Sequence, residues 1–127
     1  MNVNKGTSVL VVDDCEDNRL LMELLLQSEG YKVKSVDSGI KGLAEINKQH
    51  PDLIILDLMM PDISGLEVVR HLKDRCHQSR IPIILLTANS QIRHHNVRDV
   101  DVVCHKPFNL DNILEKIHSL VALQVAT

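Results

Sequence analysis

Five polar side chains follow short apolar runs of this sequence, at positions where buried strands would end. Asp13 and Asp14 follow the run SVLVV, Asp57 follows LIIL, and Thr87 follows IPIILL. Lys106 comes two residues after the run VDVVC. An ionised carboxylate at the end of a buried strand costs free energy unless a cation or hydrogen-bond donors pair with it. The chemistry of these residues therefore depends on whether the fold brings them together.

Three carboxylates gathered at one place would favour a divalent cation. At an effective dielectric constant of about 20, two carboxylates at about 4 Å repel each other by roughly 4 kcal/mol, which a bound cation would relieve. Ligands that are all oxygen atoms favour a hard ion such as Mg²⁺ over zinc. With the Lys106 ammonium and the Thr87 hydroxyl nearby, the set is suited to stabilise a phosphoryl group on Asp57.

The apolar runs that must position these residues alternate with segments of helical period along the chain. The runs cover residues 8–12, 31–36, 53–56, 81–86 and 100–104. Four of them are almost wholly apolar, which is typical of strands covered on both faces. The run YKVKSV alternates apolar and polar residues, which indicates a strand at the sheet edge.

Helices are predicted between the runs and after the last one. Leu20, Leu21, Leu24 and Leu25 recur at helical spacing, and Gly30 follows as a stop signal. Capping residues precede two further helices: Asp37 or Ser38, and the capping box Ser64 with Glu67. A continuous apolar stripe at helical spacing follows Asn109 and predicts the last helix. Because parallel crossovers are right-handed, this order predicts a doubly wound five-stranded α/β domain. Ligands of such sheets bind at the carboxyl ends of the strands, where the polar residues lie.

Length and composition limit the remaining possibilities. The chain of 127 residues fits a single domain, residues 1–127 with a core of about 8–122. The net charge of −3 gives no electrostatic basis for direct binding to nucleic acid or anionic membrane. No apolar stretch approaches the ~20 residues of a membrane span, and no secretory signal is present, so a cytoplasmic location is expected. The chain is expected either to stand alone or to be a piece of a longer protein.

One set of motifs resembles the receiver domain of two-component response regulators, in particular the chemotaxis type of single-domain receiver. The set consists of Asp13-Asp14, Asp57 with Met60-Pro61 and Gly65, Thr87-Ala88, and Lys106-Pro107-Phe108. The resemblance covers essentially the whole chain, with its motifs in order at the strand ends. It implies a flavodoxin-like strand order, 2-1-3-4-5.

The resemblance also implies a role for each acidic residue. Asp57 would be the phosphoacceptor, taking a phosphoryl group from a sensor histidine kinase or a phosphotransfer protein. Mg²⁺ would be bound directly by Asp14, Asp57 and the backbone carbonyl of Met59, and through a water molecule by Asp13. Such a protein catalyses only its own phosphorylation and dephosphorylation, and it acts on a downstream protein target.

Two further residues have roles implied by the family. Thr87 would donate a hydrogen bond to one phosphoryl oxygen, and Lys106 would pair with another. The bond between Lys106 and Pro107 is commonly cis in this family, a conformation that proline permits.

Two features depart from the family pattern. The aromatic switch residue expected three positions before Lys106 is replaced by Val103. The segment between Thr87 and Asp101 is also short for a parallel crossover. We therefore expect the fourth helix, within about residues 91–98, to be short or irregular. Family members often form homodimers or bind targets through the neighbouring face, which this departure alters.

Three alternative functions follow from the same residues. A phosphorylation-independent docking module of the receiver fold is favoured by the missing aromatic and the short crossover. An Mg²⁺-dependent phosphotransfer enzyme with an Asp nucleophile would need a second carboxylate two residues after Asp57, where the chain has Met59. A flavin-binding domain is rejected because the acidic segment after the first strand would repel phosphate.

Overall fold

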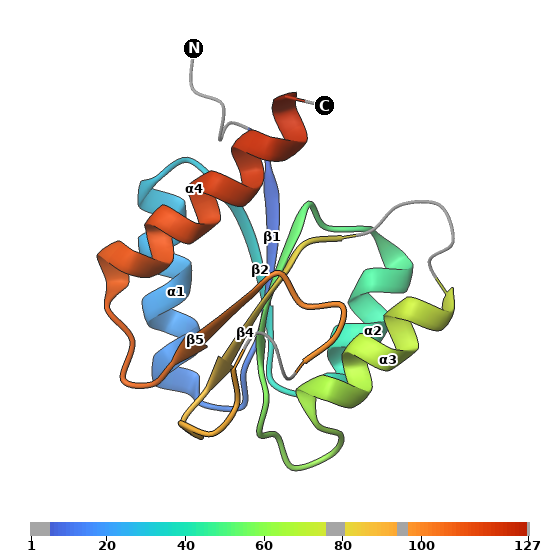
Figure 1. Ribbon diagram of the computed structural model, residues 1–127. Coiled ribbons are helices and arrows are strands. Elements are labelled where there is room, and N and C mark those ends of the chain that lie inside the picture. The colour runs from blue at the N-terminus through green and yellow to red at the C-terminus, as the bar shows by residue number, and fades with distance from the viewer. Residues whose placement is uncertain (1–5, 76–80, 94–96, 127) are drawn as a thin grey trace.

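The computed structural model describes residues 6–75, 81–93 and 97–126 of the chain. It shows a parallel sheet between two layers of helices (Figure 1). The strands are β1 Ser8–Val12, β2 Lys32–Val36, β3 Leu53–Asp57, β4 Ile83–Thr87 and β5 Val102–His105. The helices are α1 Glu16–Ser28, α2 Gly39–Lys48, α3 Gly65–Arg75 and α4 Leu110–Ala126. The strand order β2-β1-β3-β4-β5 confirms the predicted doubly wound fold.

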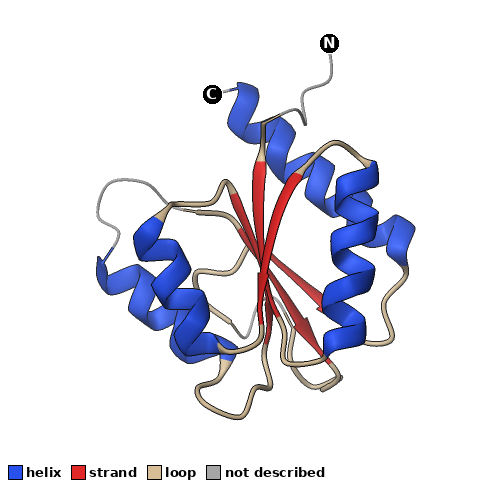
Figure 2. Cartoon of the chain, turned by 180° about the vertical axis from the view of Figure 1, so that it is seen from behind, coloured by secondary structure: helices blue, strands red, loops and turns tan. Residues whose placement is uncertain are grey.

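Each face of the sheet is covered by one pair of helices, as the view from behind shows (Figure 2). One hydrophobic cluster joins a face of the sheet to α1 and α4, for example through Leu26 and Ile117. The other cluster joins the opposite face to α2 and α3, for example through Ile46 and Val68. Because β1, β3 and β4 are buried between the layers, the polar residues at their ends are held on a rigid frame.

The two outer strands differ in sequence pattern. β2 lies at one edge with Lys32 and Lys34 exposed, as its alternating pattern predicted. β5 lies at the opposite edge, and its Val102 and Val103 are half-buried. The largely apolar run at residues 100–104 therefore does not mark a central strand in this sheet.

Capping residues define the helix ends, and those at Ser38 and Ser64 were predicted from the sequence. Ser38, Ser64 and Asn109 each accept a hydrogen bond from the backbone N–H three residues later, at 3.2, 3.2 and 3.1 Å. Gly30 follows α1 with a φ angle of 91°, a left-handed conformation that glycine adopts without a steric penalty. These local signals are why the helices begin and end where the sequence indicated.

The buried face of α1 differs from the prediction. Three of the four leucines expected to face the core are exposed: Leu20 (53%), Leu21 (40%) and Leu24 (59%). Met22 and Leu26 are the buried side chains of this helix. The helix itself was predicted correctly, but the leucine spacing selected the wrong face.

The segment between β4 and β5 contains no helix among its described residues, 88–93 and 97–101, which form turns and bends. The prediction that the helix within about residues 91–98 would be short or irregular is confirmed for the described residues of this segment. Residues 94–96 lie outside the described chain. Ile92 and Val97 pack against the cluster shared with α2 and α3. Within the described residues, no helix has the length and apolar character needed to cross a membrane.

Candidate functional site

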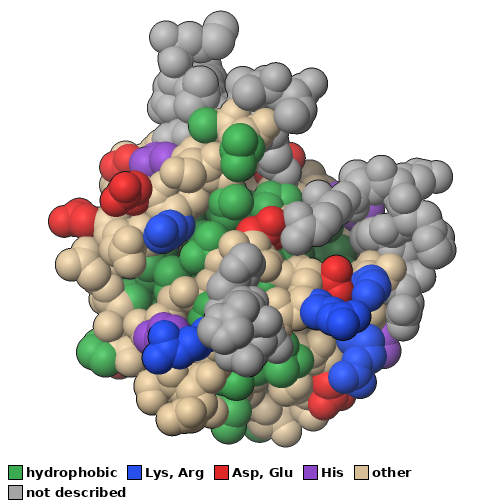
Figure 3. Space-filling view, in the orientation of Figure 1, with side chains coloured by type: hydrophobic (Ala, Val, Ile, Leu, Met, Phe, Trp, Pro, Cys, Tyr) green, Lys and Arg blue, Asp and Glu red, His purple; other side chains and the backbone are tan. Residues whose placement is uncertain are grey.

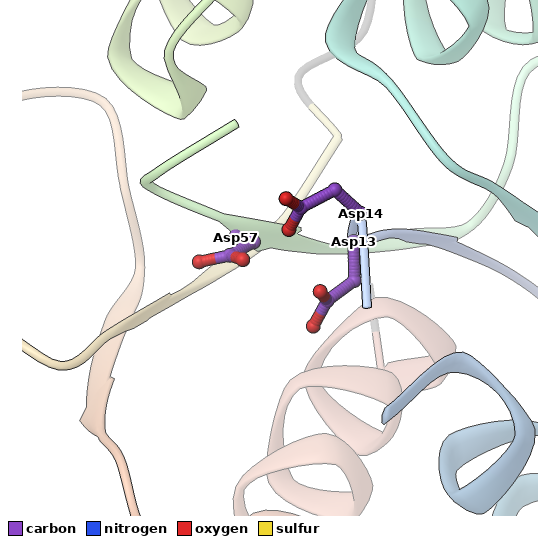
Figure 4. A group of neighbouring side chains, drawn as sticks. All are labelled: Asp13, Asp14 and Asp57. Atoms are coloured by element: carbon purple, nitrogen blue, oxygen red, sulfur yellow. The ribbon is translucent and has the colours of Figure 1, made fainter. Parts of the chain in front are cut away.

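The three acidic residues meet at the carboxyl ends of β1 and β3. Asp13 and Asp14 directly follow β1, and Asp57 is the last residue of β3, its parallel neighbour. One carboxylate oxygen from each residue lies within 4.8 Å of the other two (Figure 4). Asp13 and Asp57 are buried, while Asp14 is exposed. The site is therefore an acidic group open to solvent on one side.

Lys106 places a positive charge against this group. Its Nζ lies 3.2 Å from Oδ2 of Asp57 and 3.8 Å from Oδ2 of Asp13. The lysine follows β5, and its backbone N–H donates to the carbonyl of Thr87 at 2.7 Å. The following peptide bond, to Pro107, is cis, as the resemblance implied. Of the five polar residues predicted to converge, four are in one cluster.

Thr87 ends β4, next to the strand that carries Asp57. Its side chain is fully buried, and its Oγ1 accepts a hydrogen bond from the backbone N–H of Asn89 at 3.0 Å. A hydroxyl that accepts one hydrogen bond can still donate its proton. Thr87 therefore shapes the loop after β4 and retains a donor for a group bound at the site.

The environment of Asp57 opposes its ionisation. Burial raises the pKa of Asp57 above its ordinary value, and the neighbouring Asp13 carboxylate raises it further. The Lys106 ammonium and the N–H of Met59, which donates to Asp57 Oδ1 at 3.3 Å, lower this pKa in part. An additional cation would therefore stabilise the charged form of Asp57, which Lys106 and the Met59 N–H stabilise only in part.

The acidic group fits a hard divalent cation. Opposite ligands of an octahedral Mg²⁺ ion lie about 4.2 Å apart, since each Mg–O distance is about 2.1 Å. The oxygens of the three carboxylates lie within 4.8 Å of one another, a spacing close to this value. The donor set contains oxygen only, which suits Mg²⁺ better than a soft metal.

Supporting residues around Asp13 were not predicted from the sequence. Arg19 donates to the Asp13 carbonyl at 2.8 Å, and Asn18 donates to its Oδ2 at 3.4 Å. The backbone N–H of Cys15 donates to Oδ1 at 2.9 Å. The available signal was the position of Asn18 and Arg19 in the first turn of α1, directly after the acidic pair.

Gly65 allows α3 to begin close to β3, the strand that ends at Asp57. A Cβ atom at this position would lie 2.5 Å from the backbone carbonyl oxygen of Asp57. The N–H of Gly65 donates to the carbonyl of Leu58 at 2.8 Å. Because Gly65 has no side chain, the start of α3 can lie this close to the end of β3 beside the acidic group.

Comparison with known protein families decides the classification. The family model described as "Response regulator receiver domain" matches residues 9–118. The chain belongs to this receiver family. DivK of Brucella ovis, a polar-differentiation response regulator, is 41% identical over 81 residues, which span 64% of this chain and 66% of DivK. The transcriptional regulatory protein AfsQ1 of Streptomyces coelicolor is 37% identical over 109 residues, 86% of this chain and 44% of AfsQ1. The receiver domain thus matches under two thirds of either relative.

Solved structures give the same classification. The response regulator TrrA of Thermotoga maritima, crystallised in complex with Mg(2+)-BeF, is 37% identical to this receiver domain, with a TM-score of 0.81. The match covers 90% of this chain and 98% of TrrA. The chemotaxis protein CheY4 of Vibrio cholerae is 28% identical, with a TM-score of 0.80 and the same coverage of both chains.

Proposed function

We propose that this receiver domain accepts a phosphoryl group on Asp57 from the phosphohistidine of a sensor histidine kinase or a phosphotransfer protein. The observation that carries the proposal is the geometry of the acidic group, three carboxylate oxygens within 4.8 Å with the Lys106 ammonium 3.2 Å from Asp57. We assign Asp14, Asp57 and the Met59 carbonyl as direct Mg²⁺ ligands and Asp13 as a ligand through water. The Mg²⁺-bound state of TrrA, a 37% identical relative, supports this assignment.

In the proposed transfer, a carboxylate oxygen of Asp57 attacks the phosphorus atom as the bond to the histidine nitrogen breaks. The product is an acyl phosphate, and the histidine leaves as a neutral imidazole because its other ring nitrogen is protonated in the phosphohistidine. When bound, Mg²⁺ supplies positive charge that offsets the negative charge of the transferring oxygens. Lys106 neutralises a phosphoryl oxygen from the other side, and Thr87 donates its hydroxyl proton to another. The domain acts on itself rather than on an external substrate.

The proposed output is a shift between two conformations of the loop after β4. The Lys106 N–H to Thr87 carbonyl bond of 2.7 Å joins the two strands whose end residues would contact the phosphoryl group. His105 lies 2.6 Å, through its Nε2, from the carbonyl of Ile92 in the same loop. A movement of Thr87 toward the phosphoryl group would therefore be transmitted to this loop without an aromatic residue at Val103. The output is binding to a downstream protein in the cytoplasm.

Incubation with a small phosphodonor and Mg²⁺, followed by intact-mass measurement, tests the proposal. We expect a mass increase of one phosphoryl group in the native protein, abolished in Asp57→Asn and in samples with the metal chelated. Asp111→Asn is the matched control, because Asp111 is exposed in the first turn of α4 and does not belong to the acidic group. This variant should be labelled to the same extent as the native protein.

The phosphorylation-independent docking module is the second candidate, and the helix-free crossover among the described residues favours it. An unchanged mass of the folded native protein with several phosphodonors would support this candidate and contradict phosphoryl transfer. Equal labelling of native protein and Asp57→Asn would instead contradict the assignment of the acceptor residue.

A further inference from the structure

A pocket of about 300 Å³ lies between α3 and the segment that links β4 to β5. Its apolar surface comes from Leu66, Val69 and Val97, which are buried or half-buried. Its exposed rim is charged and consists of Arg70, Lys73, Arg98 and Asp99. The pocket uses none of the residues of the acidic site, so the proposed phosphoryl transfer does not account for it.

The irregular crossover forms one wall of this pocket and is attached to the fold at several points. Val97 packs into the hydrophobic cluster shared with α2 and α3. Asp99 adopts a positive φ of 65°, and its carboxylate pairs with Lys73 of α3 at 3.4 Å. Non-glycine residues seldom adopt this backbone conformation. The apolar recess is therefore bounded on both sides by described, packed chain.

The charge of the pocket is opposite to that of the protein. Three cationic side chains and one carboxylate line it, whereas the whole chain carries −3. Lys and Arg side chains gather over α3 on the face shown in Figure 3. Lys73 is paired with Asp99, but within the described part of the chain neither Arg70 nor Arg98 has an acidic partner. Two guanidinium groups are thus available for carboxylates, which they bind through paired hydrogen bonds.

The size of the recess sets the apolar part of the ligand. A cavity of ~150 Å³ suffices for a benzene-sized group, so the pocket has room for about two leucine-sized side chains. On a helix, side chains three or four positions apart lie on one face, and acidic residues beside them would reach the rim. Nucleic acid is not favoured, because no aromatic side chain lines the pocket for base stacking.

We propose that this pocket, with Arg70 and Arg98 at its rim, docks an acidic amphipathic helix of a partner protein. Two apolar side chains of that helix would enter the recess between α3 and the crossover. Carboxylates on either side of them would pair with the two arginines. Docking at this surface depends on the described part of the crossover, residues 97–99, and does not require phosphorylation of Asp57.

The test is an amide NMR titration of the full chain with a designed helical peptide of about 15 residues. The peptide presents leucines at helical spacing, flanked by glutamates, and the matched peptide carries lysines in place of the glutamates. We expect saturable shifts at residues 66–73 and 97–99 with the glutamate peptide only. The double variant Arg70→Glu/Arg98→Glu should weaken its binding roughly tenfold or more.

The matched control is Lys48→Glu/Lys116→Glu, which changes the net charge by the same amount at exposed positions of α2 and α4. This control should bind the glutamate peptide as the native protein does. The proposal is overturned if no saturable shift appears up to about 1 mM peptide, or if the shifts map to the exposed leucines of α1. Equal binding of the lysine peptide, or undiminished binding by the arginine double variant, overturns it as well. Because no phosphodonor is present, these outcomes are independent of the labelling experiment on Asp57.

Discussion

Asp57 occupies an environment that opposes its own charge. It is 4% exposed, and its nearest charged neighbours include another buried carboxylate, that of Asp13. Lys106 is the nearby counter-ion, and it is shared between the two acids at 3.2 and 3.8 Å. Such an arrangement lowers the stability of the metal-free protein and prepares the site for a cation. This is the trade between stability and function that is common at binding sites.

The Asp57→Asn variant should be more stable than the native protein when metal is chelated. The substitution removes a buried charge, and we expect the free energy of unfolding at pH 7 to rise by about 1 kcal/mol. Because the pKa of Asp57 is raised in the folded state, the penalty is absent below the unfolded-state pKa of about 3.9 and grows as the pH rises through the folded-state pKa. Urea unfolding curves should show the difference between the proteins shrinking toward pH 4.

The control for this comparison is Asp111→Asn, an exposed substitution that should change stability by less than about 0.5 kcal/mol. Equal or lower stability of Asp57→Asn at pH 7 would mean that Lys106 already compensates the buried charge fully. The electrostatic account of the site would then be wrong.

At the scale of elements, local signals were predictable from the sequence and long-range contacts were not. Ser38 and Ser64 cap their helices through residues three positions away, so the sequence alone identified them. The buried face of α1 was missed because residues 20–26 are apolar on nearly every side, and periodicity cannot select among several faces. The support of Asp13 by Arg19 was also missed, because it depends on where α1 begins relative to β1.

A long-range contact joins three elements at the other end of the sheet. The Tyr31 hydroxyl, just before β2, lies 2.7 Å from Nδ1 of His118 on α4. Nε2 of the same histidine lies 3.1 Å from the carboxylate of Glu29, at the end of α1. Burial first, and the Glu29 carboxylate second, raise the pKa of Tyr31 to about 12. This contact should couple the stability of the protein to pH in the alkaline range.

Tyr31 is the single tyrosine of the chain, which also lacks tryptophan, so ultraviolet absorbance of tyrosinate reports on it alone. We expect a midpoint near 12 in the folded protein, against the ordinary value of 10.0 in urea. The contribution of the neutral Tyr31 hydroxyl to the stability of the fold should be complete below pH 10 and should be lost as the pH rises toward 12. Tyr31→Phe should remove this loss. A folded-state midpoint at the ordinary value would contradict the buried contact.

At the scale of the whole molecule, the parallel sheet brings residues that are far apart in the sequence together at one site. Asp13, Asp57, Thr87 and Lys106 come from four different strand ends, and the strand order places those ends along one edge. This convergence was predictable because the strands of a parallel sheet all have their carboxyl ends at the same edge. The chain-specific surface between α3 and the crossover was not, since it depends on how Val97 and Asp99 pack.

Binding of Mg²⁺ should stabilise the entire fold, because the ligand groups come together only in the folded chain. At a free Mg²⁺ concentration of about one hundred times Kd, the gain is about 2.7 kcal/mol. Thermal unfolding of the native protein should therefore shift upward with Mg²⁺ and return on chelation. Asp14→Asn should respond much less, and Asp111→Asn should respond as the native protein does. Equal stabilisation of native protein and Asp14→Asn would place the ion elsewhere.

The central claim is that the buried carboxylate at the end of β3 carries the phosphoryl group. Borohydride reduces an acyl phosphate to the alcohol, so a phosphorylated aspartate is converted to homoserine and can be located by peptide mass mapping. After treatment with a phosphodonor and Mg²⁺, we predict homoserine at position 57 and at no other aspartate. Homoserine at Asp13 or Asp14, or none in protein shown to be folded and loaded with Mg²⁺, would contradict the account.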